Sequence, residues 1–294
     1  MAKNETSFWS RFFYGLLYSL YLILFLAGGT VLGWAGQSET MLSLVRGTVL
    51  NTDPADAFAT NGVRPEVVNL LILGCDNDVY VENGAKKTRK GRSDMIMVVQ
   101  LNFDKKTIRG ISIPRDVWVS GMPGVRNTKV NALYVVGGPE LTAAYAENLL
   151  GIKIDRVIDL DFVAFQDLVD MAGGVDVFVE KRMEYHDNWA DLHIDLRPGQ
   201  QHLDGYEAMG YVRFRHTDSD FERQKRQKAF MIAVKNAIMS RWYDIPDLMN
   251  QGVRMTGGGL NSDEIAALMR FSRMVEEADI RLEMVPVYDL FGSN

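Results

Sequence analysis

Val67-Val68-Asn69-Leu70-Leu71-Ile72-Leu73 is the stretch of sequence that decides the fold. It is a nearly continuous apolar run, and Met95 to Leu101 is a second run of the same kind. Short runs like these are typical of strands that are buried on both faces of a sheet. A third segment, Thr107 to Ile113, alternates in polarity and stops at Pro114, which cannot donate to a strand ladder. The three segments predict the centre of a buried sheet.

Helical and extended patterns alternate through the rest of the chain. Strands interleaved with helices imply layers of helices on a sheet, so we expect a single layered α/β/α domain with a central mixed sheet. The further predicted strands are Arg156 to Leu160, Val175 to Val179 and Arg281 to Val287, and the predicted helices are Glu140 to Leu150, Phe162 to Met171, Gly205 to Val212, Phe221 to Arg241 and Asp263 to Glu277.

The N-terminal region predicts a single-pass membrane anchor. Residues 12–35 carry no charge and are long enough to cross about 30 Å of hydrocarbon as a helix. Lys3 and Arg11 precede this run, so residues 1–11 are expected in the cytoplasm and the chain after Gln37 outside the cell. A cleaved signal peptide is the alternative, but the run exceeds a usual signal sequence and no A-x-A site closes it. Residues 36–65 then read as an extracytoplasmic stalk, and residues 66–294 as the folded, functional domain.

Composition limits the possible partners. The chain has 294 residues, of which 47% are hydrophobic and 24% charged, and a formal net charge of −6. This acidic balance argues against bulk attraction to nucleic acid, so any anion site must be local. The single cysteine, Cys75, excludes an intrachain disulfide.

Two carboxylates are placed at the ends of the first two predicted strands. Asp76 follows the first strand in Gly74-Cys75-Asp76, and Asp94 leads into the second in Gly91-Arg92-Ser93-Asp94. If these strands are antiparallel neighbours, both acids lie at one edge of the sheet. Carboxylates with few His or Cys residues nearby suit a hard cation, so the sequence predicts a Mg²⁺ site at Asp76 and Asp94.

Cationic and amide side chains form the matching anion site. A helix that starts near Asp220 places Asp220, Arg223, Gln227, Met231 and Val234 on one face, which predicts a partly buried face, whereas Glu222 and Lys225 are expected to face water. An ordinary solvated helix is the alternative. Acids for a metal and arginines for negative oxygens are the parts that phosphoryl transfer requires. The predicted anion-binding residues are Arg92, Arg115, Arg213, Arg215, Arg223 and Gln227.

These motifs together resemble a known family. The chain contains five short motifs. In chain order they are GxD at Gly74, GRSD at Gly91, SIPRD at Ser112, KVNALY at Lys129 with a following Gly-Gly pair, and RFRHTDSDFERQKRQ at Arg213. The set resembles the LytR-CpsA-Psr family of membrane-anchored cell-envelope enzymes, and the match runs from about Asn69 to Phe230.

The resemblance implies a phosphotransferase that moves a glycopolymer from a polyprenyl diphosphate carrier to peptidoglycan. Asp76 and Asp94 would hold Mg²⁺ on the diphosphate, and the lipid tail would occupy an apolar tunnel with walls such as Phe165, Leu168 and Val234. Asp116, Asp220 or water would accept the proton of the acceptor hydroxyl. The residues expected to take part in catalysis are Arg115, Asp116, Arg213, Arg215, Asp220 and Arg223.

Other functions remain open at this point. The same site with water as acceptor would give a polyprenyl-diphosphate pyrophosphatase. A membrane-anchored regulatory module could also hold polyprenyl phosphates without turnover. The basic segment at residues 86–90 is expected to be either a solvated loop or a further phosphate contact. A nucleic-acid binder is disfavoured because acids are interspersed in the basic segment from Arg213 to Gln227.

Overall fold

The computed structural model describes residues 52–82, 85–160, 162–187, 192–214, 220–240 and 245–286. The chain divides into two units, of which the second, Thr52–Asn294, contains all of these residues. No helix in these ranges is long and apolar enough to cross a membrane. The predicted span at residues 12–35 lies outside the described residues.

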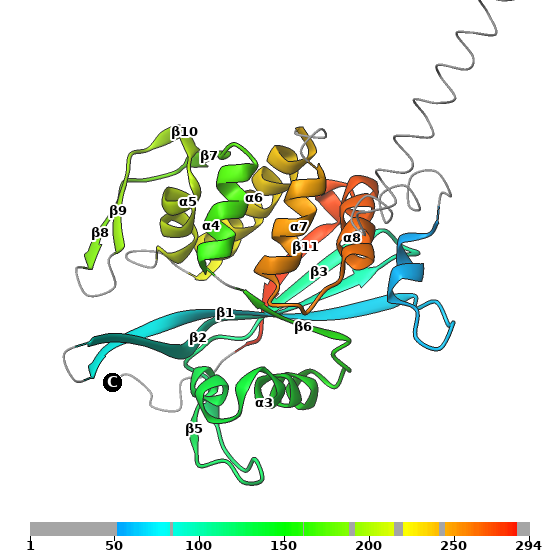
Figure 1. Ribbon diagram of the computed structural model, residues 1–294, viewed down its shortest axis with the longest axis horizontal. Helices are drawn as coiled ribbons and strands as arrows, with labels where there is room; N and C mark the ends of the chain where they lie inside the picture. The colour runs from blue at the N-terminus through cyan, green and yellow to red at the C-terminus, as the bar shows by residue number, and fades with distance from the viewer. Residues whose placement is uncertain are drawn as a thin grey trace, which may run out of the picture. The chain divides into compact units, whose positions relative to one another are not determined.

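A five-stranded mixed sheet forms the centre of this unit (Figure 1). Its order is β11-β3-β2-β1-β6; β2 is antiparallel to both β1 and β3, whereas β6 pairs with β1 and β11 with β3 in parallel. The predicted α/β class with a central mixed sheet is confirmed. The strands are β1 (Val67–Glu82), β2 (Ala85–Asn102), β3 (Thr107–Ser112), β6 (Arg156–Leu160) and β11 (Ile280–Met284).

The sheet is buried on both faces, as the apolar runs predicted. Leu71 and Leu73 of β1 pack on the side of α3, whereas Val68 and Leu70 pack on the opposite side with Phe271 of α8. Figure 1 shows α3 on one side of the sheet and α4, α7 and α8 on the other. The helices are α3 (Leu133–Leu150), α4 (Phe162–Met171), α5 (Gly205–Arg213), α6 (Asp220–Ser240), α7 (Ile245–Met255) and α8 (Ser262–Met274).

The first two strands are much longer than the sequence predicted. β1 continues past Leu73 to Glu82, and β2 begins at Ala85, so the pair forms one long antiparallel hairpin. The basic residues 86–90 therefore belong to β2, and the expectation of a loop there is wrong. The polar residues of this segment join the ladder because each strand supplies the partner of the other.

Helix α3 starts earlier than expected and is broken near its beginning. Gly137 and Gly138 have non-helical backbone angles, and Gly138 lies at φ 70°, a conformation that favours glycine. The regular part of the helix then continues from Pro139, close to the predicted start at Glu140. The glycine pair of the motif thus separates the short turn after Lys129 from the long helix that covers the sheet.

A second hydrophobic cluster lies under smaller strands. β7 (Val175–Val179) pairs with β10 (Gly199–Leu203), and β8 (Met183–Asp187) pairs with β9 (Leu192–Leu196). Val177, Leu203 and Tyr211 of this layer pack with Phe230 of α6. Helix α6 therefore contributes Phe230 to this second core, and it also packs Ile232 against the core on the α8 side of the central sheet.

Part of the predicted stalk packs into the domain. Pro54–Phe58 forms a short 3₁₀ helix, and both Ala55 and Phe58 are buried in the same core as Phe271. The folded unit consequently includes residues from Thr52 onward rather than starting at residue 66.

Candidate functional site

The two predicted metal ligands lie where the long hairpin is irregular. The β1–β2 register shifts between Gly74 and Cys75 and again between Cys75 and Asn77. Asp94 falls between the pairs Gly74–Met95 and Cys75–Ser93, and Asp76 falls between the pairs Cys75–Ser93 and Asn77–Lys90, so both positions lie at the register shifts. Bulges of this kind redirect side chains and occur often beside active sites. The expected proximity of the two positions is confirmed, although they lie within the hairpin and not at strand ends.

Arg115 connects Asp94 to the loop that follows β3. Its Nη1 donates to Asp94 Oδ1 across 2.8 Å, and its Nε lies 3.4 Å from Asp116 Oδ2. Lys129 Nζ donates to the other carboxylate oxygen of Asp116 at 2.6 Å. The hairpin β4 (Trp118–Val119) with β5 (Thr128–Lys129) holds Lys129 beside this loop. Four charged residues from three motifs thus form one chain of ion pairs.

These contacts shift two pKa values. Burial by itself lowers the pKa of Arg115, but the hydrogen bond and charge of Asp94, together with Asp116, outweigh it and raise the pKa. The hydrogen bond from Lys129 lowers the pKa of Asp116, partial burial opposes it, and the charges of Lys129 and Arg115 add to the lowering. A carboxylate with a lowered pKa is a weak proton acceptor, so the geometry argues against Asp116 as the general base.

A buried tyrosine lies under the hairpin irregularity. Tyr134 Oη donates to Asp159 Oδ2 across 2.5 Å, and Tyr134 is only 4% exposed. Burial first, then the bond to Asp159 and the proximity of Cys75, raise the pKa of Tyr134, so it stays protonated and donates. Asp159 pairs in register with Leu73, near the end of the regular part of β1. Sequence reasoning did not single out Tyr134 or Asp159, although Tyr134 closes the KVNALY motif.

Residues beside the ion pairs carry oxygen atoms of the kind that bind magnesium. Ser93 and Asn131 are buried, and Ser93 Oγ and Asn131 Oδ1 have no hydrogen-bond partner in the described part of the chain. The Asn131 backbone N–H donates to Arg115 O, so this residue lies next to the ion pairs. Carboxylate, hydroxyl and amide oxygens are the ligands that Mg²⁺ takes. Among the described side chains no group of three or more His, Cys, Asp or Glu could hold a metal ion, and the Asp76 side chain lies outside that set.

The remaining predicted residues are distributed over β2, α5 and α6. Arg92 is exposed on β2, and Arg213 is the half-buried last residue of α5. Gln227 is half-buried on α6. Arg215 lies outside the described residues, as do the side chains of Asp220 and Arg223, whose backbone begins α6.

Helix α6 is half-buried on the predicted face, and its most deeply buried residues lie one position earlier along the helix. Arg226 and Phe230 are 7% and 6% exposed, whereas Gln227, Met231 and Val234 are only half-buried. Arg226 donates through Nη2 to Phe214 O, and its guanidinium lies over the rings of Tyr211 and Phe214 (5.7 and 5.9 Å to the centroids). Because Phe214 directly follows Arg213, Arg226 fixes the start of the arginine segment against α6. The spacing of Arg226 and Phe230, four residues apart, is a signal that could have revealed this face.

The residues suggested as tunnel walls take part in core packing. Leu168 packs with Leu248, and Phe165 lies 5.8 Å from Phe230 between ring centroids. Val234 packs against the cluster under β7. These contacts are ordinary core contacts, and the lipid tunnel stays a prediction.

The fold and the site define an α/β protein in which arginines and carboxylates gather at a bulged hairpin and the loop after β3, with further arginines on α5 and α6. Comparison with known proteins gives the family. The model of the LytR_cpsA_psr family matches residues 39–293, and the chain belongs to this family. The resemblance inferred from the motifs is confirmed.

Curated relatives include named transferases. The chain is 39% identical over 193 residues to "Polyisoprenyl-teichoic acid--peptidoglycan teichoic acid transferase TagV" of Bacillus subtilis, covering 62% of this chain and 47% of that protein. It is 30% identical over 259 residues to the transferase TagU of Bacillus cereus, covering 84% and 80%. "Regulatory protein MsrR" of Staphylococcus aureus is 34% identical over 59% of this chain and 50% of its own length. The matches to TagV and MsrR thus span about half the length of those relatives.

Solved structures share the fold. The crystal structure of Bacillus subtilis TagV matches with a TM-score of 0.62 and 30% identity, covering 79% of this chain and 89% of that one. A structure titled "TagT bound to LIIa-WTA" matches with a TM-score of 0.54 and 27% identity, covering 80% of each chain. The mixed sheet with its flanking helices is therefore the fold of this family.

Proposed function

We propose that this protein is a membrane-anchored phosphotransferase that moves a glycopolymer from a polyprenyl diphosphate carrier to peptidoglycan. The observation that carries the proposal is the Arg115 guanidinium, held between Asp94 and Asp116 beside the hairpin irregularity. A cation fixed by acids at a bulge is suited to binding a diphosphate, and it lies in a chain whose relatives are named as transferases.

In this proposal the arginines bind the diphosphate and the aspartates hold the metal. Arg115 and Arg92 bind the diphosphate from the hairpin side, while Arg213, Arg215, Arg223 and Gln227 bind it from α5 and α6. Preorganised cations stabilise the negative charge that spreads over the phosphoryl oxygens in the transition state. Asp76 and Asp94 would hold Mg²⁺, which, when bound, neutralises charge on the diphosphate.

The reaction breaks a phosphoanhydride bond of the donor and forms a phosphoester bond to the acceptor. The acceptor hydroxyl oxygen bonds to the phosphorus that carries the sugar, the bridging P–O bond breaks, and polyprenyl phosphate leaves with the bridging oxygen. The hydroxyl proton passes to Asp220 or to water, because Lys129 and Arg115 hold Asp116 as a stable carboxylate with a lowered pKa. The anchor proposed at residues 12–35 would keep the extracytoplasmic domain beside its lipid substrate in the membrane.

A transfer assay tests this function. The full-length protein in detergent is incubated with a radiolabelled polyprenyl-diphosphate oligosaccharide and soluble peptidoglycan oligomers, with Mg²⁺ or with EDTA. Label in the peptidoglycan, dependent on Mg²⁺, is the expected result. Release of free sugar phosphate without transfer would instead indicate a pyrophosphatase. Binding of the lipid without turnover would indicate a regulatory module of the kind that the name MsrR suggests.

A further inference from the structure

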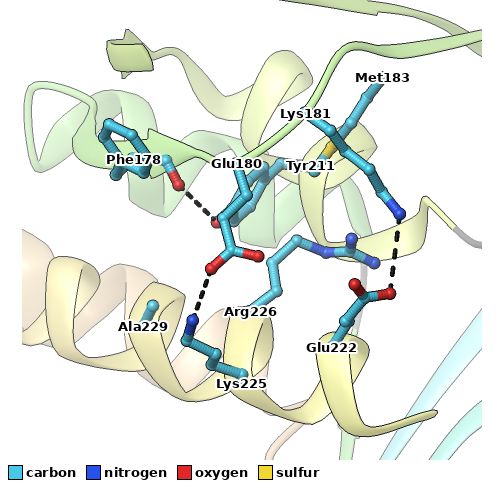
Figure 2. Close-up of a pocket in the computed structure, with 9 residues that line it drawn as sticks. All are labelled: Phe178, Glu180, Lys181, Met183, Tyr211, Glu222, Lys225, Arg226 and Ala229. Atoms are coloured by element: carbon cyan, nitrogen blue, oxygen red, sulfur yellow. Dashed lines mark hydrogen bonds and ion pairs between the residues drawn. The ribbon is translucent and has the colours of Figure 1, made fainter. Parts of the chain in front are cut away.

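A pocket with charged walls lies between the β7–β8 turn and the first turns of α6 (Figure 2). It encloses about 240 Å³. It opens partly to solvent, so it is a surface pocket and not a void in the core. It is smaller than the roughly 300–1,000 Å³ of sites that enclose whole drug-sized ligands, and so suits one chemical group of a larger molecule. Its charged lining residues are Glu180, Lys181, Glu222, Lys225 and Arg226.

Two ion pairs cross from the turn to the helix. Lys225 Nζ lies 2.7 Å from Glu180 Oε1, and Lys181 Nζ lies 3.7 Å from Glu222 Oε2. Figure 2 shows these pairs on either side of Arg226. Their side chains are between 36% and 64% exposed, and exposed pairs of this kind contribute little to stability. They can therefore rearrange when a charged group enters the pocket.

The floor of the pocket carries a desolvated positive charge. Arg226 is more than nine-tenths buried between the rings of Tyr211 and Phe214, where its charge acts more strongly than it would in water. The lining contains three cations and two carboxylates, so its formal charge is positive. Met183, Tyr211 and Ala229 add apolar surface beside the charge. This combination suits a negatively charged group on a carbon skeleton.

The pocket and the proposed diphosphate site share helix α6. Glu222, Lys225, Arg226 and Ala229 line the pocket, whereas the helical periodicity places positions 223 and 227 about a third of a turn further round the helix. A helix with its side chains is only about 10–12 Å across, so one extended substrate can reach both faces. Arg226 also binds the carbonyl of Phe214, the residue after Arg213.

We propose that this pocket binds one anionic group of a glycan substrate, either a carboxylate of the acceptor peptidoglycan or a phosphodiester of the donor polymer. The inference rests on the proposed function for the identity of the glycans. Binding at a point remote from the reacting phosphorus would orient the chain for transfer. The carboxylate and the phosphodiester are recognised by the same cations, and the experiment separates the two sources.

Binding is measured first, without lipid donor and without Mg²⁺. Isothermal titration of the full-length protein in detergent uses two probes, a disaccharide-tripeptide fragment of peptidoglycan and a lipid-free poly(glycerol phosphate) oligomer. One of them is expected to bind. Ala229→Met, which fills the pocket from an exposed helical position, and Lys225→Gln, which removes a cation, should each weaken that binding roughly ten-fold, the size of one charge-assisted hydrogen bond. The probe that responds identifies the source.

Matched variants and probes make the outcome decisive. Asn236→Met adds the same side chain to exposed α6 outside the pocket lining, and Lys228→Gln removes a lysine of the same helix outside it; both should bind as the wild type does. Amidation of the fragment carboxylates should abolish binding if peptidoglycan is the source. The proposal is wrong if neither anionic probe binds, if Asn236→Met weakens binding as much as Ala229→Met, or if the amidated fragment binds equally well.

The transfer assay separates this proposal from the proposed function. Ala229→Met should raise the KM for the substrate that the titration identifies and leave kcat and the KM of the other substrate nearly unchanged. A wild type that transfers, with an Ala229→Met variant of identical KM values, would overturn the pocket alone. A wild type that binds a probe in the pocket but transfers nothing would overturn the proposed function alone.

Discussion

Arg115 Nη1 lies 2.8 Å from Asp94 Oδ1, an ion pair between residues 21 positions apart that joins the loop after β3 to the irregular part of β2. Their side chains are 36% and 30% exposed. At this exposure an ion pair contributes only about 0.2–1 kcal/mol to stability. The pair therefore holds the guanidinium in place at the site more than it holds the fold together.

Replacing Arg115 is expected to separate activity from stability. Arg115→Ala should lower kcat of transfer about 10²–10³-fold, the usual effect of losing one preorganised group that stabilises transition-state charge. The free energy of unfolding should fall by less than about 1 kcal/mol, because the lost ion pair is partly exposed. Steady-state kinetics and urea unfolding of the same preparation check both expectations.

Arg109→Ala is the matched control for this variant. Arg109 is an exposed arginine on β3 and lies near the end of the strand that is away from the Arg115 loop. Its replacement by alanine should leave kcat unchanged. Equal loss of activity in the two variants, or a large loss of stability in Arg115→Ala, would contradict the assignment of Arg115 to the diphosphate.

Asp94→Asn tests the proposed magnesium site without relying on activity. The substitution removes a charged oxygen ligand at the bulge and should weaken Mg²⁺ binding by about ten-fold or more in a calorimetric titration of the substrate-free protein. Asp104→Asn, an exposed acid in the turn after β2, is the control and should titrate like the wild type. An unaltered Mg²⁺ isotherm in Asp94→Asn would exclude Asp94 as a ligand.

The central strands could be predicted because their signal is local. Val67 to Leu73 and Met95 to Leu101 are apolar on both faces, and the structure buries them between two cores. The continuation of the hairpin through Asp76 could not be predicted, since Gly, Asp and Asn are rare in strands and only the pairing of the two segments makes them extended. Consequently the acids were expected at strand ends and are found at bulges.

Some contacts of the site and of the core depend on packing between distant elements. Tyr134 and Asp159 are 25 residues apart, and Arg156 meets Glu264 across 108 residues. A sequence pattern gives no distance for such pairs. The burial of Arg226 is different, because Arg226 and Phe230 are only four residues apart on α6. A predicted helix face that started one residue earlier would have contained both of them and indicated a buried arginine.

Glu264 connects the sheet to the helix that covers it. It is 2% exposed and accepts from Arg156 Nε of β6 at 2.8 Å through Oε1 and from the Asn261 backbone N–H at 2.9 Å through Oε2. Asn261 Oδ1 in turn accepts from the Glu264 N–H, which completes a capping box at the start of α8.

Glu264→Ala should lower the free energy of unfolding by about 1–3 kcal/mol, because it leaves the Arg156 guanidinium and the helix end without their acceptor. Chemical denaturation followed by circular dichroism measures this loss. Asp263→Ala, an exposed acid in the same first turn, should cost less than about 1 kcal/mol, the contribution of a charge near a helix N-terminus. Equal losses in the two variants would argue against a special role of the Arg156 contact.

Tyr134 should make the free energy of unfolding depend on pH in the alkaline range. Tyr134→Phe removes the hydrogen bond to Asp159 and should cost about 1.5–3 kcal/mol at pH 8, the range for a bond to a charged group. Burial, Asp159 and Cys75 raise the pKa of Tyr134 above its ordinary value of 10.0 in the folded state. A raised pKa stabilises the fold fully below pH 10. This contribution is lost as pH rises further, because the unfolded tyrosine then ionises while the folded one stays protonated to higher pH.

The advantage of the wild type over Tyr134→Phe should therefore be constant up to about pH 9.5 and shrink between pH 10 and 11.5 in urea unfolding curves. Tyr145→Phe is the matched control, because burial alone raises the pKa of Tyr145, so at pH 8 this variant should unfold nearly like the wild type. A Tyr134→Phe protein as stable as the wild type at pH 8 would show that the Asp159 bond contributes nothing. A stability difference that does not change up to pH 11.5 would show that the tyrosine ionises equally in the folded and unfolded chains.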